Sequence, residues 1–299
     1  MEFVFITDTH FRKSSNVRTD EDYLKSLCDK LQFVVDCANK WNATLIIGGD
    51  LFDTPSQPDL VKTAVIQVLM KCSKKPISIS GNHDILFNNR DNNYKTSIYC
   101  LSVADVLRLL SPGEDSILVE GEQKCKIAVT RPMEDCGLPQ LGIFHGFLNK
   151  EDGINTFLFE DVPQNDRCCI CLGHDHVPYE PIKYNNSVIY RIGAMVRAIR
   201  NDSEDRIPQL LRIRLTDKGT WATKLYDIPC KDSSLIFKTK KAKAVKRDSG
   251  DYSQIIEQIR QVSEKEITFM SAIEMVANSE TADYVRDVYN TVQSTAESK

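Results

Sequence analysis

The stretch Ala43-Thr44-Leu45-Ile46-Ile47-Gly48-Gly49-Asp50 joins a short apolar run to two glycines and a carboxylate. An apolar run of this length, bounded by glycine, is typical of a buried strand. The same arrangement occurs at Phe3–Thr7, which runs into Asp8, and at Pro76–Ser80, which runs into Gly81-Asn82-His83-Asp84. The sequence therefore places a polar motif at the end of each of three predicted strands.

Two segments between these strands have helical periodicity, Asp20–Lys40 and Leu60–Cys72. Strand, motif and helix in repetition predict a parallel βαβ core whose motifs gather at the carboxyl ends of the strands. Further apolar runs in the second half predict the strands Leu141–Phe144, Cys168–Leu172, Ser187–Ile192, Leu210–Leu215 and Trp221–Ile228. We therefore expect an α/β fold of the α+β sandwich type, with two sheets, flanking helices and a small helical C-terminal extension.

All five histidines lie in short clusters that also hold carboxylates, an asparagine or glycines. Two adjacent divalent metals need three or four nitrogen or oxygen ligands each, with one carboxylate shared between them. Carboxylate, imidazole and amide donors without thiolate suit a reactive site rather than a closed structural zinc site. We predict that seven side chains bind two metals: Asp8, His10, Asp50, Asn82, His145, His174 and His176.

Asp50 is the expected bridging ligand, because a short carboxylate beside glycines can approach both ions. His83 lies between Asn82 and Asp84 in the chain. We predict His83 to be a catalytic imidazole that is not a ligand and that protonates the leaving oxygen, with Asp84 as the catalytic partner that orients it.

Read in order, the motifs DxH, GD, GNHD, H and GHxH resemble those of the calcineurin-like metallophosphoesterases over roughly residues 1–200. The block Gly49–Pro58 is similar to that of SbcD-like nuclease subunits of bacterial and phage double-strand-break repair, which partner a coiled-coil ABC-type ATPase. The resemblance implies one metal on Asp8, His10, Asp50 and His176, and the other on Asp50, Asn82, His145 and His174. It also implies manganese as the usual ion, with Mg²⁺, Fe or Zn²⁺ as alternatives, and His83 as the catalytic histidine.

The chain departs from this family pattern at Asp53, where archaeal and eukaryotic nucleases often carry a histidine. We interpret Asp53 as a helix-capping carboxylate or one that supports a ligand. Five arginines cluster near the last motif in the sequence: Arg197, Arg200, Arg206, Arg212 and Arg214. About half of them fit solvated strand ends, and one or two that face the site would bind phosphate.

The chain is predicted to divide into a catalytic domain at 1–230, a basic linker at 231–250 and a helical segment at 251–299. About fifty residues are too few to form a good core alone, so the last segment should pack on its own domain or on a partner. The resemblance implies that this partner is the ATPase.

Composition indicates an ordinary globular chain, with 299 residues, 41% hydrophobic and 27% charged. A net charge of −4 argues against coating nucleic acid with the whole surface. No run of 18 apolar residues is present to span a membrane, and Phe3–Ile6 leads directly into Asp8 without the features of a signal peptide. Ten scattered cysteines, several of them in apolar runs such as Cys168, Cys169 and Cys171, predict reduced thiols and a cytoplasmic protein.

Three functions fit these patterns. The first is a dimetal DNA nuclease that hydrolyses phosphodiesters in DNA repair or recombination, with DNA and the ATPase as partners. The second is a phosphodiesterase or phosphatase for small phosphorylated metabolites, and the third is a non-catalytic scaffold subunit. A homodimer is left open, because fold analogy alone does not decide substrate or assembly.

Overall fold

The structure is a computed structural model that describes residues 1–15, 18, 23–86, 90–149, 156–197 and 206–237. The chain divides into two compact units, Met1–Thr239 and Lys240–Lys299. The whole second unit, and with it the expected helical segment 251–299, lies outside the described residues. The predicted boundaries at 230 and 250 therefore remain predictions.

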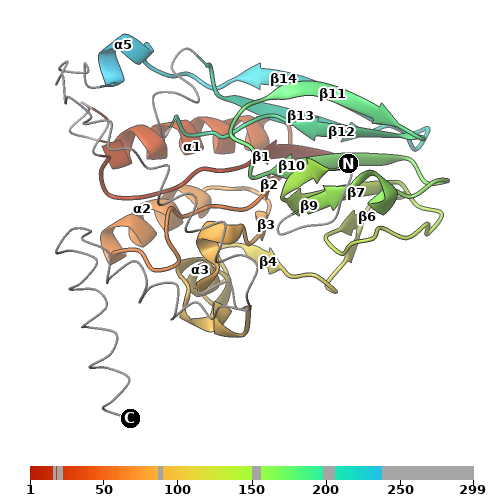
Figure 1. Cartoon of the computed structure of the whole chain (residues 1–299), viewed down its shortest axis with the longest axis horizontal. Helices are drawn as coiled ribbons and strands as arrows, with labels where there is room; N and C mark the ends of the chain where they lie inside the picture. Colours follow the sequence, from red (N-terminus) through yellow and green to blue (C-terminus); the bar gives the residue numbers. More distant parts are fainter. Residues whose placement is uncertain (16–17, 19–22, 87–89, 150–155, 198–205, 238–299) are drawn as a thin grey trace, which may run out of the picture. The chain divides into compact units, whose positions relative to one another are not determined.

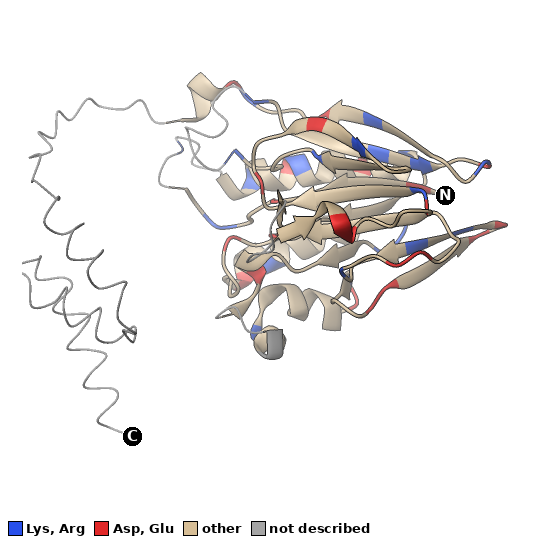
Figure 2. Ribbon diagram, turned by 45° about the vertical axis from the view of Figure 1, so that its right-hand side comes forward, with Lys and Arg blue, Asp and Glu red and all other residues tan. Residues whose placement is uncertain are grey.

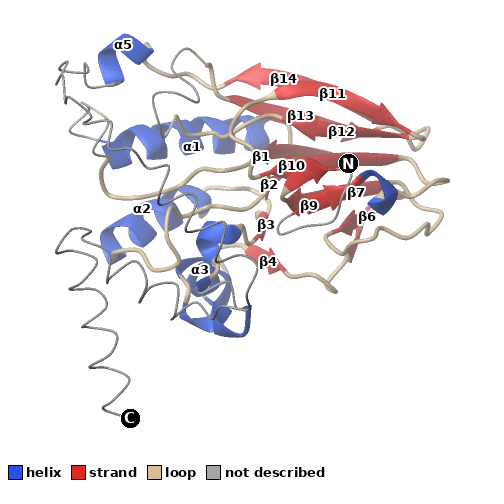
Figure 3. Ribbon diagram, in the orientation of Figure 1, coloured by secondary structure: helices blue, strands red, loops and turns tan. Residues whose placement is uncertain are grey.

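The first sheet has six strands and carries the predicted parallel core (Figures 1 and 3). Its strands, in spatial order, are β14 (Trp221–Asp227), β13 (Gln209–Leu215), β1 (Glu2–Ile6), β2 (Thr44–Ile47), β3 (Ile77–Ile79) and β4 (Arg108–Leu110). Strands β1 to β4 are parallel, whereas β13 and β14 add in antiparallel fashion. The carboxyl ends of β1, β2 and β3 therefore meet at one rim of the sheet.

The second sheet also has six strands. Their order is β11 (Tyr179–Tyr184), β12 (Ser187–Arg191), β10 (Cys168–Gly173), β7 (Gln140–His145), β6 (Gln123–Ala128) and β5 (Ser116–Glu120). Strands β6, β7, β10 and β12 are parallel, which again collects several carboxyl ends at one edge. A separate pair consists of β8 (Phe147–Asn149) and β9 (Thr156–Leu158).

Successive side chains of β1 point to opposite faces of the sheet, and this explains how the layers pack. Phe3 and Phe5 point into the core between the two sheets, together with Ile46 of β2 and Ile143 of β7. Val4 and Ile6 point the other way, into a core that they share with the helices α1 (Tyr23–Lys40), α2 (Asp59–Leu69) and α3 (Ser97–Val103). Both faces of the strand are buried, so its sequence is continuously apolar. The predicted sandwich of two sheets with flanking helices is confirmed.

Several elements differ from the sequence prediction. Helix α2 ends at Leu69 and not at Cys72, because Lys71 and Cys72 donate to carbonyls three residues back and tighten the chain into a turn. The remaining short elements were not predicted: helices α3 and α5 (Ser233–Ile236), the 3₁₀ turns η1 (Asn82–Asp84), η3 (Arg90–Lys95) and η4 (Phe159–Asp161), and strands β4, β5, β6, β8, β9 and β11.

All ten cysteines lie within the described residues and are free thiols. Cys125, Cys168, Cys169 and Cys171 are buried on strands of the second sheet, where they fill core space as small apolar side chains. In the described ranges, no helix has both the length and the apolar character that crossing a membrane requires.

Candidate metal centre

The loops that follow β1 and β2 run side by side and hold the first two motifs together. The N–H groups of Asp8 and His10 donate to the carbonyls of Gly49 and Asp50, over 3.1 and 3.0 Å. Phe11 continues this pairing to Leu51 over 2.9 Å. The parallel pairing of β1 with β2 is thereby extended past the strand ends, and it places Asp8 and His10 beside Asp50.

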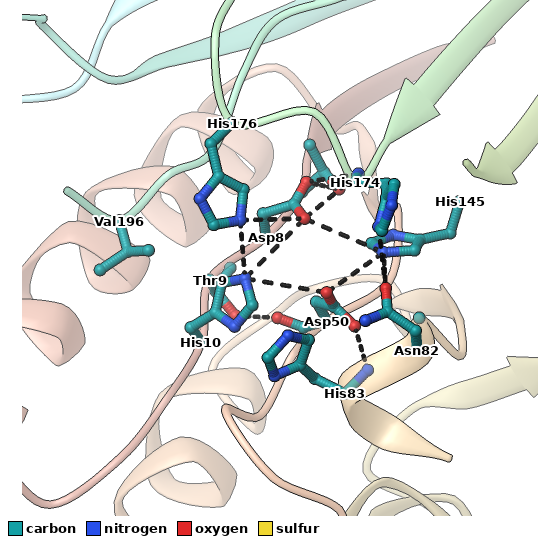
Figure 4. Close-up of polar contacts among 12 residues, drawn as sticks. Asp8, Thr9, His10, Asp50, Asn82, His83, His145, His174, His176 and Val196 are labelled. Carbon is teal, nitrogen blue, oxygen red and sulfur yellow. Dashed lines mark hydrogen bonds and ion pairs between the residues drawn. The ribbon is translucent and has the colours of Figure 1, made fainter. Parts of the chain in front are cut away.

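The other strand ends bring the remaining predicted ligands to the same place (Figure 4). Asn82 begins the 3₁₀ turn after β3, His145 is the last residue of β7, and His174 and His176 follow β10. All seven side chains predicted as ligands thus gather in one cluster, with contributions from both sheets. Asp8 and Asp50 are almost fully buried at its centre, at 0% and 1% exposure.

The donor distances fit two ions that share Asp50. Ligands bonded to one ion at about 2.1 Å stand roughly 3 to 4 Å apart. Asp50 Oδ2 lies 3.7 Å from His10 Nε2 and 3.1 Å from His145 Nε2. His176 Nε2 lies 3.0 Å from His10 Nε2 and 3.7 Å from Asp8 Oδ1. Asp50 groups with His145 and His174 on one side, and Asp8 groups with His10 and His176 on the other.

His145 shows most directly that a positive charge belongs between these side chains. Its Nδ1–H donates to the carbonyl of Gly48 over 2.9 Å, which leaves Nε2 as the ligating nitrogen of the neutral ring. That nitrogen faces two oxygen acceptors, Asp50 Oδ2 and Asn82 Oδ1, each at 3.1 Å. Three electron pairs converge there, so either a proton or a metal ion must occupy the space. The donor set therefore fits a dinuclear metal site.

The pKa shifts of the ligand side chains also indicate a place for positive charge. Burial alone would lower the pKa of His145, but its hydrogen bond to Asp50 and the charges of Asp8 and Asp50 outweigh burial and raise it to about 9. Burial would raise the pKa of Asp50, and the hydrogen bond and charge of His145, with the charge of His10, instead lower it to about 2. The pKa of His174 is lowered by burial and then by the charge of His145. Without metal, protons thus take the place of the cation.

The backbone at the site is strained, and glycines give it room. Asp8, His10, Asp50 and His174 all have positive φ, at 51°, 44°, 50° and 88°. Such conformations cost about 1 to 3 kcal/mol for residues other than glycine and cluster at functional sites. A Cβ at Gly81 would lie 2.6 Å from Asp50 Cγ, so only glycine fits there. The expected close approach of backbone at the ligand motifs is therefore present.

His83 lies at the solvent side of the cluster and is exposed. Its Nδ1 is 2.7 Å from the carbonyl oxygen of Asp53, and its ring meets that of His10 edge-on with centroids 4.7 Å apart. It also stands close enough to His10 and Asp50 to form a further group of metal-binding geometry with them. The structure thus brings His83 to the predicted place, beside the expected ligands.

The structure places the Asp84 carboxylate against backbone N–H groups and the His83 ring against the carbonyl of Asp53. Asp84 is 1% exposed, and its carboxylate accepts from the N–H groups of Leu51, Phe52 and Gly81 at 3.1 to 3.2 Å. Successive side chains of a 3₁₀ turn point about 120° apart, so Asp84 is directed away from its neighbour His83. Burial, followed by the charge of Asp50, raises the pKa of Asp84 to about 7. Asp84 ties the Asp50 loop to the Asn82 turn, and the carbonyl of Asp53 orients His83.

Sequence reasoning missed the supporting role of Thr7. Its hydroxyl donates to Asp8 Oδ2 over 2.7 Å, and the N–H of His174 lies 3.0 Å from the same oxygen. A threonine at the end of a buried strand, immediately before the first ligand, was the available signal. Asp53 lies beside a predicted ligand, with Oδ1 3.5 Å from His10 Nδ1, while its Oδ2 accepts from Arg12 over 3.1 Å.

The arginines after the last motif are mostly committed elsewhere in the described part of the chain. Arg212 pairs with both carboxylate oxygens of Glu2, at 2.7 and 3.0 Å. Arg206 donates to the carbonyl of Val196 over 2.9 Å, and burial, then the charge of Arg197, lowers its pKa to about 10. The charge of Asp8 opposes that lowering. Arg200 lies outside the described residues.

Solved structures resemble this chain at low identity. TT1561 of Thermus thermophilus is 8% identical, covers 76% of this chain and 99% of its own, and has a TM-score of 0.46. A 5′-nucleotidase precursor from the same organism is 12% identical, with 76% and 54% covered and a TM-score of 0.44. Wild-type Vps29 of Entamoeba histolytica, complexed with zinc, is 13% identical, with 77% and 100% covered and a TM-score of 0.36. These similarities are too distant to support an argument about substrate.

The sequence itself provides the assignment. No curated protein sequence matches the chain. The profile of the calcineurin-like phosphoesterases matches residues 1–197, which span every strand end that contributes to the cluster. The chain therefore belongs to the calcineurin-like phosphoesterase family.

Proposed function

We propose that this protein is a dimetal DNA nuclease that hydrolyses phosphodiester bonds in DNA repair or recombination. The observation that carries the hydrolytic part is the convergence of seven side chains with nitrogen and oxygen donors, the buried carboxylate of Asp50 at their centre, with the exposed imidazole of His83 beside them. Two divalent ions bound there would supply Lewis acidity, an activated water and neutralisation of the phosphoryl charge. Manganese is the ion that we expect, from the resemblance to the SbcD-like branch.

The chain's own residues divide the remaining work. Asp50 stands between the two ligand groups and fixes their separation. His83 is held through Nδ1 by the carbonyl of Asp53, so Nε2 is the atom that can deliver a proton to a leaving oxygen. Asp53 stands behind His10, and it is held in turn by Arg12. Such carboxylate support fixes a ligating ring and raises its basicity.

The preference for DNA rests on the block Gly49–Pro58, with its similarity to SbcD-like nucleases. Basic and acidic positions are interspersed along the described strands and helices in the view of Figure 2. With a net charge of −4, the protein is suited to local contact with a nucleic acid at the metal centre rather than to broad electrostatic coating.

A decisive assay offers labelled single-stranded and double-stranded DNA, alongside bis-p-nitrophenyl phosphate, with Mn²⁺, Mg²⁺ or EDTA. We expect Mn²⁺-dependent cleavage of DNA that Asp50→Asn abolishes. Asp29→Asn is the matched control, because Asp29 is an exposed residue of α1 that pairs only with Lys25 at the surface in the described structure. Hydrolysis of the small diester with intact DNA would favour a phosphoesterase of small metabolites. Metal binding without hydrolysis of either would favour a scaffold subunit.

The ATPase partner is a separate part of the proposal and rests on the apolar helical pattern beyond residue 250. An amphipathic helix that buries its apolar face in a partner groove stabilises both chains. Deletion of 250–299 should retain Mn²⁺-dependent hydrolysis of bis-p-nitrophenyl phosphate and abolish co-purification with a coiled-coil ABC-type ATPase. A truncated protein that still binds the ATPase would place the interface elsewhere, and one that unfolds would show that the segment packs on its own domain.

A further inference from the structure

A cavity of about 410 Å³ lies directly beside the metal centre. His145 and Gly146 form part of its wall, so the cavity adjoins a predicted metal ligand. Ile79 and Ser80, at the end of β3, form another part, immediately before the motif that carries Asn82. Cavities that bind small organic ligands are typically about 300 to 1,000 Å³ in volume. A group attached to a phosphate at the metals would therefore find space of suitable size next to it.

The lining is mixed, with somewhat more polar than apolar surface. Leu110, Ile143 and Phe157 are buried residues of β4, β7 and β9, and each contributes to the wall. Polar groups come from Ser111, Thr130 and Arg131, which lie on the loops after β4 and β6, and the Arg131 guanidinium is paired with Asp161 over 3.4 Å. A flat heterocycle with hydrogen-bonding edges matches such a lining better than a purely apolar or a highly charged group does.

Asn93 supplies the specific feature of this wall. It lies in η3, and its Oδ1 is buried with no hydrogen-bond donor among the described residues. A buried carbonyl oxygen that remains unpaired costs about 1 to 3 kcal/mol, so the site favours a ligand that brings a donor. An asparagine amide pairs with the N6 and N7 edge of adenine through two parallel hydrogen bonds. Adenine is therefore the base that this wall would recognise best.

We propose that the cavity binds the nucleoside of a nucleotide phosphoester, with adenine preferred, while the phosphoryl group lies at the metal centre. This inference rests on the proposed phosphodiesterase function and specifies its substrate at one side of the scissile bond. Asn93 acts as a specificity residue that touches the base, and the apolar residues of β4, β7 and β9 bury its faces.

The test compares three chromogenic esters with Mn²⁺: the p-nitrophenyl esters of 5′-dAMP and 5′-dTMP, and bis-p-nitrophenyl phosphate. We expect kcat/KM for the dAMP ester to exceed that for bis-p-nitrophenyl phosphate, and to exceed that for the dTMP ester about tenfold. Asn93→Leu should remove most of the dAMP preference. The matched control is Asn92→Leu in the same turn, because Asn92 Oδ1 already accepts from Lys95 over 3.3 Å and Asn92 does not line the cavity. Its dAMP-to-dTMP ratio should equal that of the wild type.

Two further measurements cover an Asn93→Leu variant that does not fold and a protein that hydrolyses none of the esters. If Asn93→Leu fails to fold, Ser111→Phe fills the cavity from another wall and should lower kcat/KM for both nucleotide esters relative to bis-p-nitrophenyl phosphate. If no ester is hydrolysed, the proposed function fails, and dAMP binding to the Mn²⁺-loaded protein still decides about the cavity: Asn93→Leu should weaken it about tenfold. Equal kcat/KM for the dAMP and dTMP esters, or an equal loss for all three esters in Asn93→Leu, would overturn the proposal.

Discussion

Replacing Gly81 by alanine should dismantle both metal sites through a single added methyl group. Gly81 has φ −89° and ψ −178°, a backbone conformation that alanine adopts freely, so the substitution tests space and not backbone strain. The new Cβ would lie 2.6 Å from Asp50 Cγ and 2.5 Å from Asp50 N, with Asp50 Oδ1 closer still. The bridging carboxylate would have to move for the variant to fold.

The contact with the added methyl group sets how far the Asp50 carboxyl group must move. Ordinary contact begins at 3.4 Å, so the carboxyl carbon must shift from 2.6 Å by about 0.8 Å. Metal–ligand distances tolerate only about 0.2 Å. Displacement of groups that merely support a ligand costs about 10- to 100-fold in metal affinity, so loss of the shared ligand should cost at least about 100-fold, or ~2.7 kcal/mol. Both ions should weaken together, because Asp50 is common to them.

Calorimetric titration with Mn²⁺ measures this loss, with hydrolysis of bis-p-nitrophenyl phosphate as the second readout. Gly113→Ala is the control: a Cβ there meets no atom within 4 Å, while its φ of +92° strains the backbone. It should lose about 1 kcal/mol of folding stability and retain both ions. If Gly81→Ala bound two Mn²⁺ within threefold of the wild-type affinity, the assignment of Asp50 as the bridging ligand would be refuted.

Three further predictions concern single side chains. His83→Gln should retain two Mn²⁺ in equilibrium dialysis while turnover falls about 10²- to 10⁴-fold, and loss of metal would instead make His83 a ligand. Because the pKa of metal-free His145 is raised to about 9, Mn²⁺ must displace the proton of this ring at neutral pH. The apparent affinity for Mn²⁺ should therefore rise with pH up to about 9, and calorimetric titrations in buffers of different ionisation enthalpy should register proton release. An affinity for Mn²⁺ that does not change between about pH 6 and pH 9 would contradict this. Burial, and then the charges of Arg197 and Arg18, lower the pKa of Lys30 from 10.5 to about 7 in the folded protein. Between pH 7 and pH 10.5 the unfolded chain therefore keeps a proton on Lys30 that the folded chain has released, so the free energy of unfolding of the wild type should rise with pH over this range. Lys30→Met should therefore raise Tm at pH 7 by roughly 5 °C, with a gap that narrows towards pH 10, and a gap that widens with pH would disprove the reasoning.

The parts of the fold that could be predicted are those where local pattern and burial agree. Strands β1, β2, β7 and β10 are buried on both faces, so their sequences are continuously apolar and end visibly at a polar motif. Six of the seven candidate ligands follow from these ends and Asn82 follows β3, because parallel strands deliver their carboxyl termini to one rim.

Edge elements were not predictable in the same way. Strand β5 exposes Ile117 and Val119, at 61% and 62%, so its apolar residues face outward against the usual pattern. Strand β11 is largely exposed and contains Pro181, which argues locally against a strand. Pairing with β6 and β12 decides these segments, and such tertiary contacts leave no mark in a short window of sequence.

The position of Asp84 was likewise not visible in the sequence. Adjacency in sequence suggested that Asp84 serves His83, but direction within a 3₁₀ turn separates neighbours and sends Asp84 to the backbone of Leu51 and Phe52. The positive φ values of Asp8 and His10 were equally hidden, since neither residue is glycine. The buried amide of Asn93 became visible only with the cavity beside it.

The origin of the ligands in two different sheets has a mechanical consequence. Asp8, His10, Asp50 and Asn82 follow strands of the first sheet, while His145, His174 and His176 follow strands of the second. A bound pair of ions would link the two sheets by coordination along one rim. The rest of the interface between the sheets is held by non-directional apolar packing. Chelation should then loosen the sandwich from this rim first, with faster amide exchange at the ends of β7 and β10 than at their centres. Ions bound for phosphoester hydrolysis would thereby also stabilise the packing of the two sheets, and this stabilisation would be lost when they are removed.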